Sequence, residues 1–168
     1  MRYYPAALAL SLLAGVTASA GFSAPVQTLD PRAGALLTQG RAEFVQGRID
    51  QAIDAYEAAL TLQPGNVAIL LDLAQATRRQ GMQGKALHYY RAALVDDPQN
   101  LLAIAGEGAA LAEKGAVEKA RRNLARLKGL CGDSCEATRQ LSAAIMKGPA
   151  PRVVTAEAVK SEPVVSAN

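Results

Sequence analysis

The sequence has no tryptophan, and aromatic residues make up only 4% of its 168 residues. A core with so few large side chains has to be built mainly from alanine and leucine, and this favours elements that approach each other closely. Because alanine is also the best helix former, the composition predicts an all-α protein.

The residue types that most active sites and metal sites need are also scarce. His88 is the single histidine, and the sequence contains neither a Gly-rich phosphate loop nor a Gly-x-Ser-x-Gly elbow. We interpret His88 as a surface residue and the pair Asp96-Asp97 as a solvated helix end. Two cysteines fall short of the four ligands of a structural zinc site. We therefore predict that the protein is not an enzyme and that it has no metal and no cofactor.

The sequence contains neither a concentrated basic stripe nor an apolar run long enough to span a bilayer. The formal net charge is only +3, which argues against a nucleic-acid partner. The apolar run Ala6–Val16 is shorter than the ~20 residues that a membrane span needs. Arg2 precedes this run and Ala18-Ser19-Ala20 follows it, which is the pattern of a signal peptide. We predict a cleaved signal peptide over residues 1–20 and no stable membrane insertion afterwards; an uncleaved N-terminal anchor is the alternative.

The strongest pattern in the chain is a repeat of 34 residues between residues 31 and 147. Small residues, glycines, alanines, aromatics and prolines each recur with this spacing. The columns are Gly40, Ala74 and Gly108; Gly47, Gly81 and Gly115; Ala52, Ala86 and Ala120; Tyr56, Tyr90 and Leu124; and Pro64, Pro98 and Gly132.

Each column is typical of a helical hairpin. Asp30, Asn66 and Asn100 can cap a following helix, a glycine can end the first helix of each pair, and a proline can stop the second. The small residues allow the two helices to lie close together. We predict helices over residues 31–46, 49–62, 66–80, 83–96, 100–114 and 117–130, joined by short connections that imply antiparallel neighbours.

The pattern resembles the tetratricopeptide repeat family. The first unit (33–66) carries the motif as Gly40, Gly47, Ala52, Tyr56, Ala59 and Pro64, and the second (67–100) as Ala74, Gly81, Ala86, Tyr90, Ala93 and Pro98. The third unit (101–134) departs from it at Leu124, at Gly132 and at Glu107, whose carboxylate would need solvent or a cation. The resemblance implies an all-α solenoid, a right-handed superhelix of three antiparallel helix pairs.

The end of such an array exposes an apolar face, so a capping helix is needed. We predict this helix over residues 134–146, with Asp133 and Glu136 as its capping pair and Leu141 and Ile145 on one face. In an exported chain Cys131 and Cys135 are expected to form a structural disulfide between the sixth helix and the cap. Residues 21–30 are interpreted as a linker and residues 148–168 as a disordered tail.

The family resemblance also implies a concave groove lined by the first helix of each pair. The groove positions are Leu37, Arg41, Phe44, Leu71, Gln75, Arg78, Arg79 and Leu102, together with Val45, Ala105, Ala109 and Glu113. Because guanidinium groups favour carboxylates, we predict a protein or peptide partner that is acidic or offers a C-terminus. The alternative is that these arginines are only a solvated face. A clamp for chaperone tails is not expected, because Arg41 and Asp72 stand where such clamps need asparagine.

The resulting functional hypothesis is a periplasmic adaptor or scaffold in a Gram-negative cell envelope. Two alternatives remain: a structural module that self-associates as a homo-oligomer, and a regulatory subunit of an envelope enzyme or assembly complex.

Cleavage of the signal peptide gives a direct test. We expect the mature chain to begin at Gly21, because a small-x-small motif precedes it. Mass spectrometry of the protein from the envelope fraction checks this, and recovery of peptides from residues 1–20 in the mature protein would support the uncleaved anchor instead.

Overall fold

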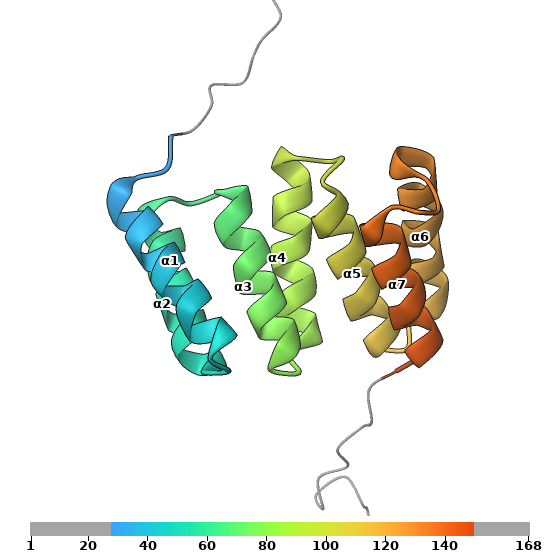
Figure 1. Cartoon of the computed structure of the whole chain (residues 1–168), viewed down its shortest axis with the longest axis horizontal. Helices are drawn as coiled ribbons and strands as arrows, with labels where there is room; N and C mark the ends of the chain where they lie inside the picture. The colour runs from blue at the N-terminus through green and yellow to red at the C-terminus, as the bar shows by residue number, and fades with distance from the viewer. Residues whose placement is uncertain (1–27, 150–168) are drawn as a thin grey trace, which may run out of the picture.

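The structure, a computed structural model, describes residues 28–149 and places seven α-helices within them (Figure 1). The helices are α1 (Pro31–Val45), α2 (Ile49–Leu62), α3 (Val67–Arg79), α4 (Gln83–Asp96), α5 (Leu101–Glu113), α6 (Val117–Cys131) and α7 (Glu136–Lys147). The all-α prediction is confirmed, and the helix bounds agree with those expected to within one or two residues. The predicted signal peptide (1–20), most of the predicted linker (21–30) and most of the predicted tail (148–168) lie outside the described residues.

The helix ends follow the local chemistry that the sequence indicated. The side-chain oxygens of Asp30, Asn66 and Asn100 accept hydrogen bonds from backbone N–H groups in the first turns of α1, α3 and α5. A glycine with positive φ follows the first helix of each pair, which ends that helix and turns the chain into the next; these are Gly47 (78°), Gly81 (87°) and Gly115 (82°).

The hairpins stand side by side, from α1 and α2 at one end to α6 and α7 at the other (Figure 1). Among the described residues the backbone of α3 approaches those of both α1 and α5, whereas the Cα atoms of α2 and α4, and those of α4 and α6, stay more than 8 Å apart. The first helices of the pairs therefore lie close together on the inner side of the array, and the second helices are spread on the outer side. None of the described helices is both long enough and apolar enough to cross a bilayer.

Two tyrosines pack closely between helices because glycines lie opposite them. The buried ring of Tyr56 lies against Gly40, and a side-chain carbon added to this glycine would overlap the ring. The buried ring of Tyr90 on α4 lies against Gly106 on α5, which belongs to the next repeat, whereas Gly40 and Tyr56 belong to the same hairpin. The sequence indicated the small residue at 40, but it gave no signal for the role of Gly106, which stands outside the repeat columns.

The third repeat has no such tyrosine, and α7 supplies the missing side chain. Leu124, in the aromatic position, is only half-buried, while Leu141 of α7 is fully buried over Gly108. A Cβ atom at Gly108 would lie 2.6 Å from Cδ2 of Leu141, so the close approach of α7 to α5 requires glycine here. The predicted capping helix is confirmed, and it packs against both α5 and α6.

The start of this capping helix corrects one prediction. Asp133 does not cap α7, because the N-cap residue is Cys135 and the helix begins at Glu136. Asp133 lies two residues earlier, and its carboxylate pairs with Nζ of Lys128 at 2.8 Å. The prediction that Asp133 and Glu136 form a capping pair is therefore wrong, because the N-cap lies two residues after Asp133.

Truncation of Leu141 tests the role of α7 as the cap. We expect Leu141→Ala to lower the free energy of unfolding by about 2–5 kcal/mol, because it opens a cavity between α5 and α7. Denaturant unfolding followed by circular dichroism measures this change. The matched control is Met146→Ala, also on α7, whose side chain is 79% exposed and whose loss should change stability by less than about 0.5 kcal/mol. Equal effects of the two substitutions would contradict the assignment.

Candidate protein-binding surface

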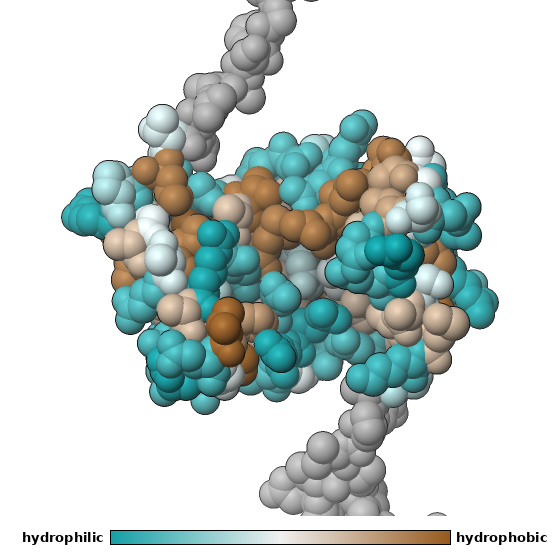
Figure 2. Space-filling model, viewed as in Figure 1, coloured by the Kyte–Doolittle hydropathy of each residue, from teal (hydrophilic) through white to brown (hydrophobic). Residues whose placement is uncertain are grey.

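The inner face is the surface that α1 and α3 present on the side where the first helices meet. Figure 2 shows the molecule from the side on which α1 and α7 lie in front, with apolar and polar side chains interspersed. The predicted groove residues are distributed unevenly on this surface. Arg41, Gln75, Arg79 and Leu102 are exposed, and Phe44, Leu71 and Arg78 are half-buried.

Leu37 does not belong to the exposed part of the predicted groove. Its side chain is only 4% exposed and packs in the core with Ile53 and Tyr56. On one side of a helix, sequence spacing alone does not separate the residues that face a neighbouring helix from those that face the groove. Leu37 therefore supports the inner face from below and has little surface to offer a partner.

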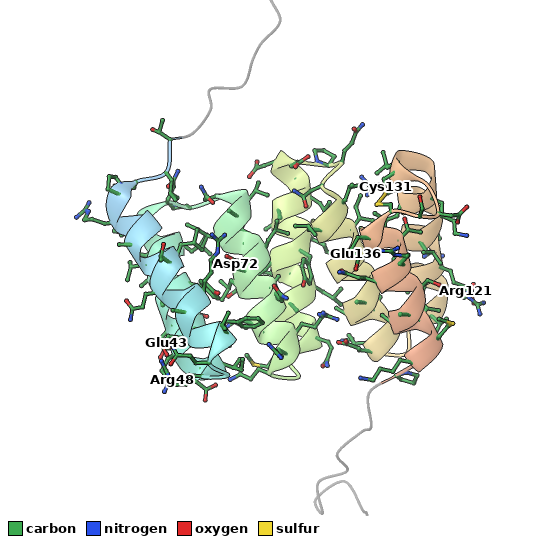
Figure 3. The ribbon with its side chains drawn as sticks, in the orientation of Figure 1. Glu43, Arg48, Asp72, Arg121, Cys131 and Glu136 are labelled. Carbon is green, nitrogen blue, oxygen red and sulfur yellow. A yellow bond between two sulfur atoms is a disulfide. The ribbon has the colours of Figure 1, made fainter. Side chains whose placement is uncertain are left out.

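Two of the predicted arginines are held by carboxylates of the neighbouring repeat. Nε of Arg41 on α1 lies 2.6 Å from Oδ2 of Asp72 on α3. Figure 3 labels Asp72 on this helix. Nη1 of Arg78 on α3 lies 2.8 Å from Oε1 of Glu113 on α5. Each pair joins the first helices of successive repeats, so much of the basic charge of the inner face is neutralised within the chain.

The third arginine is arranged differently. The guanidinium of Arg79 lies over the ring of Phe44, with Cζ 4.9 Å from the ring centroid. This geometry is that of a cation–π interaction, and it leaves the outer face of the guanidinium accessible. No ion pair to Arg79 forms among residues 28–149. Arg79 and Phe44 therefore form a cationic and apolar unit at the junction of α1 and α3.

The capping helix covers the third repeat and so shortens the inner face. Ala105 and Ala109 of α5 were predicted to line the groove, but each is 6% exposed and packs in one cluster with Ala137 and Leu141 of α7. Leu102, one turn before Ala105, remains 63% exposed. The accessible inner face thus consists of the first two repeats and the beginning of α5.

Glu107 finds the cation that the sequence analysis required for it. Its side chain is 14% exposed, and Oε1 lies 2.9 Å from Nε of Arg91 on α4. Oε2 accepts a hydrogen bond of 3.0 Å from Nδ2 of Asn123 on α6. Glu107 thus links the second repeat to both helices of the third.

Electrostatic effects on the inner face are clearest at Tyr56. Its ring is buried between the first two hairpins, near the ion pair of Arg41 and Asp72. Burial raises the pKa of Tyr56 from 10.0 to about 12; the Asp72 carboxylate adds to this rise and Arg41 opposes it. Because the folded protein holds this proton more tightly than the unfolded chain, the contribution of Tyr56 to stability is lost as the pH rises from about 10 to 12.

The chemistry of the described residues contains no sign of a metal centre. Within residues 28–149 there is no group of three or more histidine, cysteine, aspartate or glutamate side chains placed to hold a metal ion. Within residues 28–149 the inner face offers apolar side chains, two ion pairs and, at Arg79, a guanidinium that has no ion pair.

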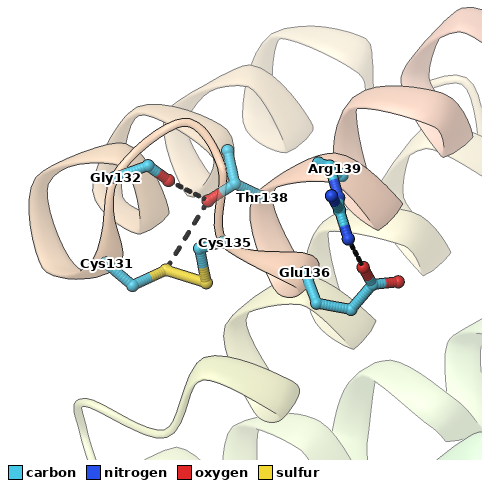
Figure 4. Close-up of a disulfide and its surroundings, with 6 residues drawn as sticks. All are labelled: Cys131, Gly132, Cys135, Glu136, Thr138 and Arg139. Atoms are coloured by element: carbon cyan, nitrogen blue, oxygen red, sulfur yellow. Dashed lines mark hydrogen bonds and ion pairs between the residues drawn. A yellow bond between two sulfur atoms is a disulfide. The ribbon is translucent and has the colours of Figure 1, made fainter.

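Cys131 and Cys135 form the predicted disulfide, which connects the last residue of α6 to the N-cap of α7 (Figure 4). Next to it, the buried hydroxyl of Thr138 donates a hydrogen bond of 2.9 Å to the carbonyl of Gly132. These two links hold the first turn of α7 against the end of α6, and so they set the direction in which α7 crosses α5.

The family described as "Tetratricopeptide repeat" matches residues 37–100 of the chain. The solved structures that are similar include the first TPR domain of Spaghetti (RPAP3) bound to the HSP90 peptide SRMEEVD, with 26% identity and a TM-score of 0.62 over 69% of this chain and 92% of that one. The Sgt2 TPR domain from Aspergillus fumigatus has 26% identity and a TM-score of 0.64 over 70% of this chain and 80% of that one. The type III secretion translocator chaperone SycD of Yersinia enterocolitica is similar in fold, with 18% identity and a TM-score of 0.61 over 68% of this chain and 81% of that one. No curated protein sequence matches the chain.

An alkaline titration tests the electrostatics of the inner face. We expect the phenol of Tyr56 to ionise near pH 12. The measurement is the difference in near-ultraviolet absorbance between the unsubstituted protein and Tyr56→Phe as the pH is raised. Asp72→Asn should lower this pKa, because it removes a negative charge and frees Arg41 to act on the phenol. Asp133→Asn, at the far end of the molecule, is the control and should leave the pKa unchanged. Ionisation of Tyr56 near pH 10 would contradict this description.

Proposed function

Because the chain is a tetratricopeptide repeat protein, we propose that it is a protein–protein adaptor that binds a peptide or helix of its partner on the inner face of the first two repeats. The observation that carries the proposal is the accessible unit of Phe44 and Arg79, with Gln75 one turn and Leu71 two turns earlier on α3. Apolar anchors beside one fixed cation are suited to a segment that offers both an apolar side chain and a carboxylate.

The capping helix supports the choice of this surface. Leu141 and Ala137 of α7 pack on Ala105 and Ala109 of α5. The residues of α3 that correspond to these two alanines in the 34-residue repeat are Leu71 and Gln75, which are half-buried and exposed. The same fold therefore already accommodates an amphipathic helix of its own one repeat further along. A partner helix with a small and apolar stripe would meet a comparable surface on α3.

The ion pairs of the inner face restrict the proposed partner further than the general class of acidic peptides. Arg41 and Arg78 are already paired with Asp72 and Glu113, so a partner carboxylate would have to displace an internal one to reach them. Arg79 needs no such exchange. We therefore propose a partner segment with one carboxylate for Arg79 and with apolar residues for Phe44 and Leu71, and we do not propose a chain of acidic residues.

The similar TPR domain of RPAP3 binds an HSP90 peptide that ends in EEVD, which supports peptide binding by this fold. In the present chain the pairing of Arg41 with Asp72 removes two positions that a clamp for a terminal carboxylate would use. The proposed partner is therefore recognised through its side chains.

We also propose that the adaptor works in the periplasm of a Gram-negative cell envelope. The support is the signal-peptide pattern of residues 1–20 and the disulfide, because disulfides persist in oxidising compartments.

Site-specific photo-crosslinking in cells tests the proposed surface. A photoreactive amino acid at Gln75, exposed on α3, should give a discrete adduct with one partner, whereas the same amino acid at Gln51, exposed on α2, should not. Arg79→Glu should reduce the adduct at position 75 about tenfold, because it replaces attraction of a carboxylate by repulsion. Gel mobility and mass spectrometry of the adduct measure both effects.

The controls separate binding from folding. Arg122→Glu changes the same charge at an exposed position of α6 and should leave the adduct unchanged. Helical content by circular dichroism should be the same for both variants, because Arg79 has no ion pair within residues 28–149 that the substitution could break. Equal adducts at positions 75 and 51, or an adduct that does not respond to Arg79→Glu, would reject this surface.

A further inference from the structure

A separate cavity of about 320 Å³ lies where α2 and α4 end, and it shares no residue with the inner face. Leu60, Leu70, Ala92 and Val95 form its apolar wall, Pro64 and Gly65 its edge, and Asp96 is the one charged residue that lines it. Val95 is 79% exposed, so the cavity opens to solvent beside an apolar side chain.

The 34-residue repeat shows why this cavity is open. The position of Ala92 on α4 corresponds to Arg126 on α6, and Pro64 corresponds to Pro98. Between the second and third repeats, the guanidinium of Arg126 donates a hydrogen bond to the carbonyl of Pro98. Between the first and second repeats, alanine leaves the corresponding path empty, and no described residue donates to the carbonyl of Pro64.

The charges around the cavity favour a cation. Asp96 is the last residue of α4, where the helix dipole places partial negative charge, and Asp97 follows it as the C-cap. Asp97 accepts a hydrogen bond of 2.9 Å from Nδ2 of Asn100, whereas no lysine or arginine within residues 28–149 pairs with Asp96. Oδ2 of Asp96 lies beside Gly65, 3.5 Å from where a Cβ atom on that glycine would be, at the edge of the cavity.

We propose that this cavity binds an arginine side chain of a partner protein. The aliphatic part of the arginine lies along Leu60, Leu70 and Val95, and its guanidinium donates to the carbonyl of Pro64 and to the carboxylate of Asp96. The partner thus supplies the side chain that Arg126 supplies within the chain one repeat later. The preference for a basic residue is opposite to that of the inner face, so the two surfaces select different segments.

Titration with single amino-acid amides tests this site on the full mature chain. The probe is N-acetyl-arginine amide, and the readout is the NMR shift of the methyl groups of Leu60, Leu70 and Val95. We expect saturable shifts at millimolar concentration and weaker binding of N-acetyl-norleucine amide, which has a similar stem without the cation. Asp96→Asn should weaken binding of the arginine amide about fivefold, because it removes one partly exposed ion pair.

The matched variants use the repeat itself. Ala92→Arg should abolish the shifts, because the new side chain takes the path that Arg126 takes between the next two repeats. Ala58→Arg adds the same residue at the equivalent exposed position of α2, which does not line the cavity, and should leave binding unchanged. Circular dichroism of each variant confirms that it is folded.

Three results would overturn the proposal. The first is equal binding of the norleucine amide together with no effect of Asp96→Asn, which would make the cavity a purely apolar one. The second is an absence of methyl shifts with the arginine amide. The third is shifts that persist in Ala92→Arg, which would place the binding elsewhere. None of these results depends on the inner face, so the adaptor proposal is tested separately.

Discussion

The structure depends on close approach between helices at positions where one partner has no side chain. Tyr56 lies against Gly40, Tyr90 against Gly106 and Leu141 against Gly108, and in each case an added carbon would overlap the larger residue. A chain with so few aromatic residues fills its core by bringing backbones together, and these three side chains then need a glycine opposite. The spacing of neighbouring helices at these three places follows from these contacts.

The same constraint couples stability at the C-terminal end to the size of the binding surface. The third repeat has Leu124 in place of the tyrosine, and α7 compensates by placing Leu141 over Gly108. In doing so α7 covers Ala105 and Ala109, which would otherwise extend the inner face. The disulfide between Cys131 and Cys135 holds the start of α7 in this position. The residue changes that make the third repeat irregular therefore also confine the accessible surface to the first two repeats.

Ion pairs between successive repeats have a comparable effect on charge. Arg41 with Asp72, and Arg78 with Glu113, connect first helices that lie side by side on the inner side of the array. A largely exposed pair such as that of Arg41 with Asp72 adds little to stability, typically about 0–1 kcal/mol. Both pairs reduce the basic charge of the inner face. The inner face then presents Arg79 on Phe44, while the cavity between α2 and α4 presents Asp96. The molecule thus presents an arginine on one surface and a carboxylate on another.

The sequence by itself determined the helices, their order and their pairing, because the 34-residue columns combine caps, turn glycines and small residues that act over a few neighbouring positions. It also indicated which residues could line the inner face, since these recur at fixed places in the first helices. Only the tertiary structure decided which of them are accessible. Leu37 is buried, Ala105 and Ala109 lie under α7, and two arginines pair with carboxylates about one repeat away. The contact of Gly106 with Tyr90 and the cavity beside Ala92 likewise became visible only in the tertiary structure. The physical reason is that helical periodicity gives the direction of a side chain around its own axis, whereas its neighbours depend on how closely other helices approach.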